Sequence, residues 1–180
     1  MNKLAIIDAD GLAYQSSKET LEESINILDE KIQNIFTKTE ATHYVMFISK
    51  GKYFRHNIDP EYKSNRKKYP TQLKWIKSLK SYLEEKWNAQ WMEGVEADDL
   101  CAYWFNKNLT VFNIGLDSET IDFSEKCKLP LDNEFKPLIP ILCSPDKDLL
   151  QSIPGKHWNY TYKLTNEAKK ESKTNPEYVI

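Results

Sequence analysis

Short apolar runs alternate with amphipathic helical patterns along this 180-residue chain, and this alternation constrains the fold more than any other feature. Residues 3–8 and 43–49 are apolar runs of strand length. Between them, residues 17–36 carry Leu and Ile at alternating four- and three-residue steps, which predicts an amphipathic helix. Strands that alternate with helices favour an α/β fold in which a mainly parallel central sheet is flanked by helices.

The alternation continues through the rest of the chain. Helical spacing of apolar residues predicts helices over residues 71–87 and 96–107. A further helix is predicted over residues 144–153, with Ser144 as its N-cap and Pro145 at its first position. Weaker patterns indicate an extension of the second strand over 52–58, strands over 89–92, 110–115 and 138–144, and a helix start at Asn175 and Pro176.

Composition indicates a single globular domain over residues 1–180. Apolar residues make up 40% of the chain and aromatic residues 12%, which is enough for a sizeable core. We find no apolar run as long as a membrane span and no signal peptide before Asp8. The three cysteines form no C-x-x-C pair, which disfavours structural zinc and a disulfide framework and favours a reducing compartment. Residues 116–140 show weak periodicity and are expected to form an insertion or a long loop.

Charge is distributed unevenly along the chain. The formal net charge is -2, but residues 50–80 contain eight lysines and two arginines against two acids, so this window carries +8 and the other residues carry -10. A basic segment beside an acidic body suggests a polyanion that is held close to a group of carboxylates. A solvated lysine-rich face is the alternative that composition leaves open.

Three groups of acidic residues follow predicted strands. In open α/β sheets, ligands bind at the carboxyl ends of the strands, so these groups are expected to meet at one edge of the sheet. Each group alone is also explained as helix capping, because acids in a first turn favour the helix dipole and accept free N–H groups. The groups are Asp8 and Asp10; Glu93, Glu96, Asp98 and Asp99; and Asp146 and Asp148.

Convergent carboxylates at one edge predict a divalent cation. Several carboxylates in one crevice repel each other and cannot all stay ionised without a cation. Oxygen ligands without histidine or cysteine indicate Mg²⁺ or Mn²⁺, and two such ions about 4 Å apart suit phosphodiester hydrolysis. The basic window of residues 50–80 would hold the phosphate backbone of the substrate.

Four motifs, in this order and spacing, resemble one known family. They look like the motifs of the flap endonuclease-type 5' nucleases, which include phage and bacterial 5'-3' exonucleases and the 5'-nuclease domain of DNA polymerase I. The resemblance covers about residues 4–150, and it implies a PIN-like fold in which residues 50–80 form a basic helical arch. The motifs are IIDADG at 6–11, EYKSNRKK at 61–68, EGVEADDL at 93–100 and SPDKDLL at 144–150.

The resemblance implies a metal-dependent 5'-3' exonuclease or flap endonuclease of replication or repair. Its partners would be single-stranded 5' ends and flaps of DNA, with RNA–DNA hybrids as a further candidate substrate, and its cofactor two Mg²⁺ or Mn²⁺ ions. We expect a monomer in the cytoplasm of a bacterial or phage-infected cell, with no membrane association. The implied metal ligands are Asp8, Glu96, Asp98, Asp99, Asp146 and Asp148; Lys63 and Arg66 would contact the scissile phosphate, Tyr62 would stack on a base, and Arg55, Lys67 and Lys68 would bind the strand.

The chain departs from the family pattern at two places. Family members often carry an aspartate at the end of the second strand, where this chain has Ser49, a neutral and weak ligand. Asp10 is a candidate to replace that contact. The G-D-x-x-D-N stretch and the helix-hairpin-helix-type module that follow in the family are absent from these 180 residues, so we expect a chain that lacks the duplex-binding module.

Three other functions stay open on the sequence. A haloacid-dehalogenase-like phosphatase would use Asp8 as nucleophile and Asp10 as general acid and base, but it leaves EYKSNRKK and EGVEADDL without a role. A nucleic-acid-binding protein without catalysis would accommodate Ser49 and the missing module. A PIN-type ribonuclease would share the metal site but is disfavoured by the arch-like segment.

Overall fold

A five-stranded sheet forms the centre of the molecule. The structure is a computed structural model that describes residues 2–64, 74–114, 138–153, 155–161 and 178–179. The strand order is β2-β1-β3-β4-β5, and all neighbours pair in parallel except β4 and β5. The mainly parallel α/β fold predicted from the sequence is therefore confirmed. The strands are β1 (Lys3–Asp8), β2 (His43–Phe47), β3 (Ile139–Cys143), β4 (Lys156–Trp158) and β5 (Tyr178–Val179).

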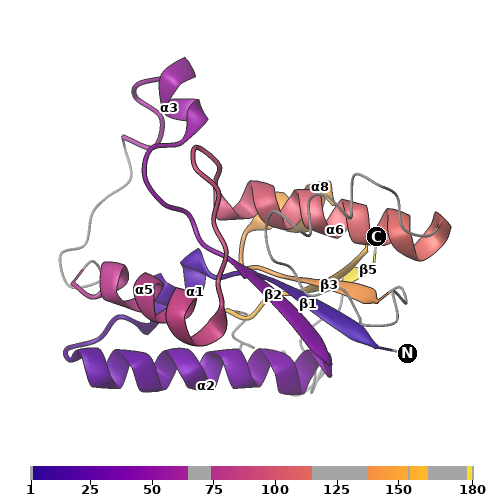
Figure 1. The fold of residues 1–180 in the computed structure, drawn as a ribbon, viewed down its shortest axis with the longest axis horizontal. Helices are drawn as coiled ribbons and strands as arrows, with labels where there is room; N and C mark the ends of the chain where they lie inside the picture. The colour runs from indigo at the N-terminus through magenta and orange to yellow at the C-terminus, as the bar shows by residue number, and fades with distance from the viewer. Residues whose placement is uncertain (1, 65–73, 115–137, 154, 162–177, 180) are drawn as a thin grey trace, which may run out of the picture.

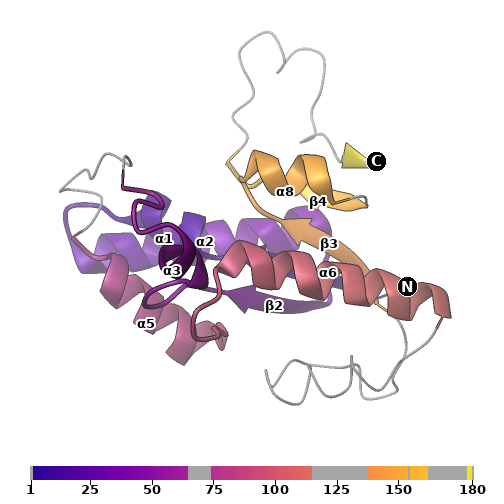
Figure 2. The same ribbon diagram turned by 90° about the horizontal axis from the view of Figure 1, so that it is seen from above.

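Helices cover both faces of this sheet. Figures 1 and 2 show α1, α2 and α5 on one face and α6 and α8 on the other. The short helix α3 stands apart from both layers, beyond the carboxyl ends of the strands. The helices are α1 (Asp10–Ser16), α2 (Leu21–Thr39), α3 (Phe54–Ile58), α5 (Ile76–Trp87), α6 (Ala97–Ile114) and α8 (Lys147–Ser152).

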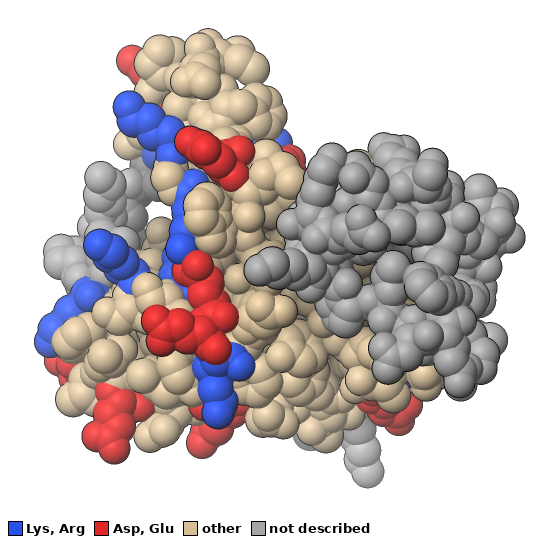
Figure 3. All heavy atoms as spheres, in the orientation of Figure 1, with Lys and Arg blue, Asp and Glu red and all other residues tan. Residues whose placement is uncertain are grey.

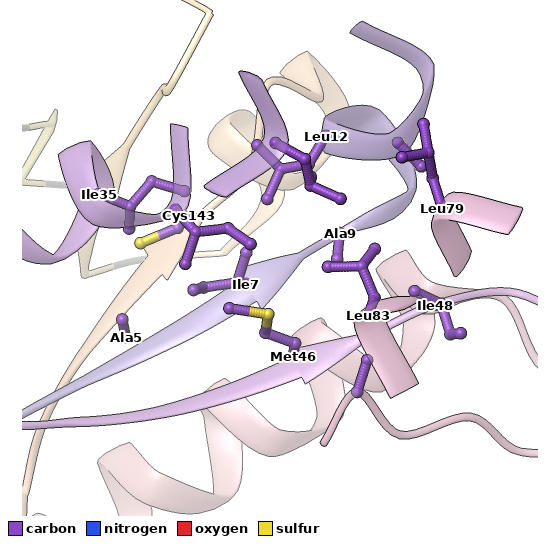
Figure 4. Packing of buried hydrophobic residues seen from close by; sticks show 14 of the residues in the cluster. Ala5, Ile7, Ala9, Leu12, Ile35, Met46, Ile48, Leu79, Leu83 and Cys143 are labelled. Atoms are coloured by element: carbon purple, nitrogen blue, oxygen red, sulfur yellow. The ribbon is translucent and has the colours of Figure 1, made fainter. Parts of the chain in front are cut away.

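Alternation along the strands divides the core into two clusters. Ala5 and Ile7 of β1 face α1, α2 and α5, where they pack with Met46 and Leu83 (Figure 4). Their neighbours in β1 face α6, where fully buried Trp104 lies. Both clusters follow from the two-residue period of a strand, since successive side chains point to opposite faces. Burial of each large apolar side chain contributes about 1.5–3 kcal/mol, so the two clusters fix the positions of the strand ends.

The connection order places a topological switch point at the carboxyl edge of the sheet. β2 and β3 lie on opposite sides of β1, so the chain reverses its direction of travel across the sheet between these neighbours. Ligands of open α/β sheets bind outside the carboxyl ends of the strands at such a switch point. Asp8, the last residue of β1, and Ser144, the first residue after β3, flank it.

Several predicted elements differ from the structure. Residues 52–58 form α3 rather than a strand, and residues 110–114 continue α6 rather than forming a strand. The predicted strand over 89–92 is reduced to one parallel bridge between Phe47 and Gln90. In each case tertiary packing outweighed the local preference for a strand. β-branched and aromatic residues can be accommodated in a helix or in a strand once they are packed against the rest of the protein.

Other differences concern the ends of elements. The last helix begins at Lys147 with Asp146 as its N-cap, so the prediction of Ser144 as N-cap was wrong. The helix α1 and the strand β4 were not predicted. Tyr178–Val179 is a strand, whereas a helical turn was predicted there; Asn175 and Pro176 lie outside the described residues.

The predicted insertion also lies mostly outside the described residues. Within its range of 116–140, the structure describes only the residues from 138 onward, and β3 begins at Ile139. In the part of the chain that the structure describes, no helix has the length and apolar character needed to cross a membrane.

Candidate functional site

Asp8 lies at the centre of the carboxyl edge. It is only 7% exposed, and its carboxylate accepts hydrogen bonds from the Ser144 hydroxyl at 3.0 Å and the Asp10 backbone N–H at 3.3 Å. The Tyr160 hydroxyl donates to the Asp8 backbone oxygen at 2.6 Å. These contacts tie the ends of β1, β3 and β4 together around one carboxylate.

Burial, together with the nearby charges of Asp10 and Asp98, raises the pKa of the Asp8 carboxyl from 3.8 to about 7, against the lowering effect of the hydrogen bonds from Ser144 and the Asp10 N–H. Asp98 has a raised pKa for the same reasons, first burial and then the charges of Asp99 and Glu96. The two carboxylates therefore lie in a partly buried environment that favours an added positive charge.

Gly11 is required by this packing. A Cβ atom added at Gly11 would lie 2.5 Å from the Tyr160 hydroxyl oxygen and 3.1 Å from a ring carbon of Pro145. The glycine of IIDADG thus allows α1 to pass beneath the residues that follow β3 and β4.

The start of α6 supplies a second group of acids. Glu96 is 3% exposed, and its carboxylate accepts hydrogen bonds from Arg55 at 2.9 Å, from the Tyr62 hydroxyl at 2.9 Å, and from the Lys63 ammonium. Arg55 also binds Asp99 through both terminal nitrogens, each at 2.6 Å from a carboxylate oxygen. This fork geometry is the strongest form of the arginine–carboxylate pair.

These partners reverse the effect of burial. Burial would raise the pKa of Glu96, but the hydrogen bonds from Lys63 and Tyr62 and the Lys63 charge outweigh it, so the pKa is lowered. The hydrogen bonds to Asp99 raise the pKa of Arg55, which is therefore cationic at any physiological pH. Lys63 has a φ of 60°, a left-handed conformation that costs a non-glycine residue about 1–3 kcal/mol.

Asp10 belongs to a separate hydrogen-bonded chain. Its carboxylate pairs with the Lys80 ammonium at 2.7 Å and accepts the Ser49 backbone N–H at 3.0 Å. Lys80 also donates to the Ser49 backbone oxygen at 2.7 Å, and the Ser49 hydroxyl accepts the Ala97 N–H at 2.8 Å. The Ser49 hydroxyl thus accepts the first N–H of α6, and the Asp10 carboxylate joins the residue Ser49, which follows β2, to Lys80 of α5.

Asp146 and Asp148 follow β3, as predicted. Asp146 caps α8 by accepting the Asp148 N–H at 2.9 Å, and its own N–H donates to the Ser144 hydroxyl at 3.1 Å. Ser144 therefore bridges Asp8 and the start of α8. Capping and metal binding are compatible for Asp146, because a carboxylate has lone pairs beyond those a single cap uses.

The structure thus brings Asp8, Glu96, Asp98 and Asp99 to one edge, with Asp146 and Asp148 after the adjacent strand β3. Arg55, Tyr62 and Lys63 contact this group directly. The predicted residues Arg66, Lys67 and Lys68 lie outside the described residues.

Lys80 was expected in the arch, but α5 packs on the sheet through Leu79 and Leu83, and Lys80 contacts Asp10. Ser144, Tyr160 and Lys80 are site residues that were not predicted from the sequence. Ser144 stands in the SPDKDLL motif and Lys80 in the basic window of residues 50–80, whereas no motif contains Tyr160.

The donor set fits a hard divalent cation. Within the described residues, no group of three or more His, Cys, Asp or Glu side chains is arranged to hold a metal ion. Asp8 and Asp98, however, are oxygen donors with raised pKa values, while Arg55 engages Glu96 and Asp99 and Lys63 engages Glu96. The residues therefore fit a metal site in which those ion pairs would be exchanged for the cation.

The surface around this edge alternates in charge. Figure 3 shows lysine and arginine side chains on the side of the molecule that runs from α3 toward α5, with acidic side chains between them. Exposed aromatic rings lie among these cations: Arg55 lies 4.9 Å from the ring centre of Phe54, and Lys50 lies 4.8 Å from that of Trp91. Such mixed faces suit a flexible polyanion with stacked bases.

Comparisons with known proteins agree with this architecture. Residues 3–115 match the family "5'-3' exonuclease, N-terminal resolvase-like domain". A bacteriophage T5 flap endonuclease, in a pseudo-enzyme-product complex with DNA and metal ions, is similar with a TM-score of 0.62 and 18% identity, over 89% of this chain and 56% of that chain. No curated protein matches.

Two further solved structures have the same fold. A bacteriophage T5 protein co-crystallised with metal ions gives a TM-score of 0.56 and 20% identity, over 89% of this chain and 55% of that chain. A T5 5'-exonuclease with bound zinc gives 0.53 and 18%, over 94% of this chain and 60% of that chain. The chain therefore spans little more than half the length of the structures that it resembles.

Proposed function

Because the chain belongs to the 5'-3' exonuclease family through its N-terminal resolvase-like domain, we propose that it hydrolyses phosphodiester bonds at the 5' ends of DNA in a divalent-metal-dependent reaction. The observation that carries the proposal is the buried Asp8 carboxylate, whose raised pKa and acidic neighbours call for a cation at the carboxyl edge of the sheet. The substrates are single-stranded 5' ends and flaps, with RNA–DNA hybrids as a second class.

The metal ligands in this proposal are the acids at that edge. Asp8 and Asp98 would hold the cation, and the full set of acids would hold two Mg²⁺ or Mn²⁺ ions. Bound there, the ions would supply Lewis acidity that activates water and neutralises charge on the phosphate. The full ligand set is Asp8, Glu96, Asp98, Asp99, Asp146 and Asp148.

This chain's own residues orient the substrate around the ions. Arg55 and Lys63 offer charge-assisted hydrogen bonds to the phosphate, and Tyr62 offers a ring face to an unpaired base. Ser144 and the Asp10 N–H fix the Asp8 carboxylate by hydrogen bonds, so its oxygens keep one orientation while the substrate binds. Arg66, Lys67 and Lys68 continue the phosphate-binding surface in this proposal.

A cleavage assay tests the proposal. The protein is incubated with 5'-labelled single-stranded DNA, flap DNA and an RNA–DNA hybrid in Mg²⁺, in Mn²⁺ or in EDTA. Metal-dependent release of label that is lost in Asp98→Asn supports the proposal. Binding of the same DNA without cleavage in either metal would instead identify a non-catalytic binding protein.

The phosphatase alternative depends on Asp10 being available as a general acid and base. Asp10 is instead paired with Lys80 and with the Ser49 N–H, which leaves it poorly placed to transfer a proton. Hydrolysis of a small phosphate monoester that Asp10→Asn abolishes would restore that alternative.

A further inference from the structure

The cationic side chains that serve the substrate in the proposed function also bind the acids that serve the metal. Arg55, Tyr62 and Lys63, which we call the latch, all donate to Glu96, and Arg55 also binds Asp99. The latch residues come from α3 and the turn after it, whereas both acids come from the start of α6. One group of contacts therefore joins two elements that are 33 to 44 residues apart in sequence.

Within the described residues, the latch carries most of the polar contacts between its segment and the body of the protein. None of the five residues of α3 is buried, and Phe54 and Ile58 are 45% and 78% exposed. The backbone of α3 also donates a hydrogen bond to the body, from the Phe54 N–H to the Gly94 oxygen at 2.8 Å. Since little apolar surface would be lost, release of the latch requires mainly that its charges find other partners.

The latch and a divalent cation compete for the same oxygens. Glu96 is almost wholly buried, so its charge needs a cationic partner at all times. A Lys63 ammonium and a divalent cation on one carboxylate repel each other at contact distance, so a cation that binds Glu96 displaces Lys63 and weakens the hold of Arg55. The left-handed backbone at Lys63 is a strained conformation that the contact with Glu96 maintains, which lowers the cost of release.

We propose that Arg55 and Lys63 couple the binding of the nucleic-acid phosphate to the binding of the metal. The inference rests on the proposed function. A metal ion that takes Glu96 and Asp99 frees the latch cations for phosphate, and a phosphate that takes the cations frees the two acids for metal. By reciprocity, each ligand tightens the other by the same factor, within the range of about 5- to 150-fold that is usual for coupled sites.

Metal affinity is the direct readout. Mn²⁺ is titrated into the full chain, and the free ion is followed by its paramagnetic resonance signal, with and without a phosphorothioate single-stranded oligonucleotide that resists cleavage. Oligonucleotide without protein corrects for Mn²⁺ bound by the strand itself. The oligonucleotide is expected to tighten Mn²⁺ binding about tenfold or more.

The Arg55→Gln variant distinguishes a coupling role of Arg55 from a purely structural one. Loss of a competing cation should tighten Mn²⁺ binding to the free protein about tenfold and should reduce the effect of the oligonucleotide. A residue that only supports the fold would give the opposite sign, because a disordered site binds metal more weakly. Lys38→Gln is the matched control, since it removes the same charge from an exposed side chain of α2, outside the basic window of residues 50–80, and should change the Mn²⁺ affinity by less than about twofold.

Folding of the variant is checked by thermal unfolding in EDTA and in Mn²⁺. Arg55→Gln is expected to lower the unfolding temperature in EDTA and to recover it in Mn²⁺, since the ion then neutralises Glu96. If Arg55→Gln does not fold, Lys63→Gln is measured in its place with the same expected signs. Weaker Mn²⁺ binding in the variant, or an oligonucleotide that leaves the wild-type Mn²⁺ affinity unchanged, overturns the inference.

The outcomes distinguish this inference from the proposed function. If metal and oligonucleotide binding are coupled but no DNA is cleaved, the role of the latch is supported and the nuclease function is refuted. If DNA is cleaved in a metal-dependent reaction but binding is not coupled, the nuclease function is supported and the role of the latch is refuted.

Discussion

Asp8 and Glu96 are two carboxylates at the same edge of the sheet with nearly equal burial and opposite electrostatics. Their exposed fractions are 7% and 3%. The pKa of Asp8 is raised to about 7, whereas the pKa of Glu96 is lowered. Burial raises the pKa of both carboxyls, but their partners differ: Asp8 has neutral donors and acidic neighbours, whereas Lys63, Tyr62 and Arg55 outweigh burial at Glu96.

The difference shows how a site can be kept ready for a cation without losing stability. If every acid lacked a cationic partner, the folded state would carry several uncompensated buried charges. If every acid were paired, a divalent cation would have to displace all the partners at once. In this arrangement Asp8 is available to a cation, and Glu96 can exchange its present cationic partners for the same cation.

The largest effect is expected from Asp8→Asn. The amide keeps a similar shape and can accept the hydrogen bond from Ser144, but it removes the charge that attracts the cation. Loss of one ligand from a metal site removes several kcal/mol of transition-state stabilisation, so cleavage should fall by about a thousandfold or more. The check is the single-turnover cleavage rate in Mg²⁺, and Mn²⁺ affinity measured on the same variant should fall with it.

Stability supplies the control for this variant. Because Asp8→Asn removes a buried charge, the free energy of unfolding at pH 8 in EDTA should stay the same or rise. A variant that loses cleavage together with stability would mean that Asp8 supports the fold, and it would break the contrast with Glu96.

The second effect is a pH dependence of opposite sign at the two acids. The folded state binds the Asp8 proton more tightly than the unfolded chain, so the contribution of Asp8 to stability is greatest below pH 3.8 and falls as pH rises from 3.8 to about 7. The span corresponds to roughly 4 kcal/mol. Chemical denaturation in EDTA across this range should show a slope that Asp8→Asn flattens.

Glu96 should act on the acid side of the profile. Its pKa is lowered, so its contribution to stability is present above pH 4.5 and is lost as pH falls through the lower folded-state value. Glu96→Gln should therefore flatten the acid limb and leave the slope between pH 4.5 and 7 in place. Identical profiles for the two variants would show that their environments do not differ in the way that the structure indicates.

Much of this arrangement could be predicted from the sequence. The strands at 3–8 and 43–49, the helix that became α2 and the grouping of acids after strands follow from apolar periodicity and from the general position of ligands in α/β sheets. The family resemblance is confirmed over residues 3–115. The roles of the individual acids as metal ligands stay predictions.

What could not be predicted is which acid has a cationic partner. Arg55 and Asp99 are 44 residues apart, and no local pattern says that α3 folds back onto the first turn of α6. Asp8 and Ser144 are 136 residues apart and meet only because β1 and β3 are neighbours. The sequence shows which acidic residues follow the strands, but tertiary contacts determine which of these acids has a cationic partner.

A smaller effect on stability and cleavage is expected from substitution of Asp10. This residue was a candidate metal ligand in the sequence, and in the structure it forms a salt bridge with Lys80. Asp10→Asn weakens the pair with Lys80 but keeps an acceptor for the Ser49 N–H. We expect a loss of about 1–2 kcal/mol in the free energy of unfolding and less than about a tenfold loss of cleavage. The measurement is a double-mutant cycle with Lys80→Met, in which a coupling energy near zero would show that the pair is not a cross-link.

The smallest effect is expected at Ser49, where the family often has an aspartate and this chain has a cap. Ser49→Ala leaves the buried Ala97 N–H without its acceptor at the start of α6, so it should cost about 1–2 kcal/mol in the free energy of unfolding. Ser16→Ala is the matched control, since Ser16 is equally buried and its hydroxyl has no hydrogen-bond partner within the described residues. Metal affinity should change little in either variant. If Ser49→Ala instead weakened Mn²⁺ binding tenfold without loss of stability, the Ser49 hydroxyl would be a metal ligand. The metal site would then include the residue after β2 as well as Asp8.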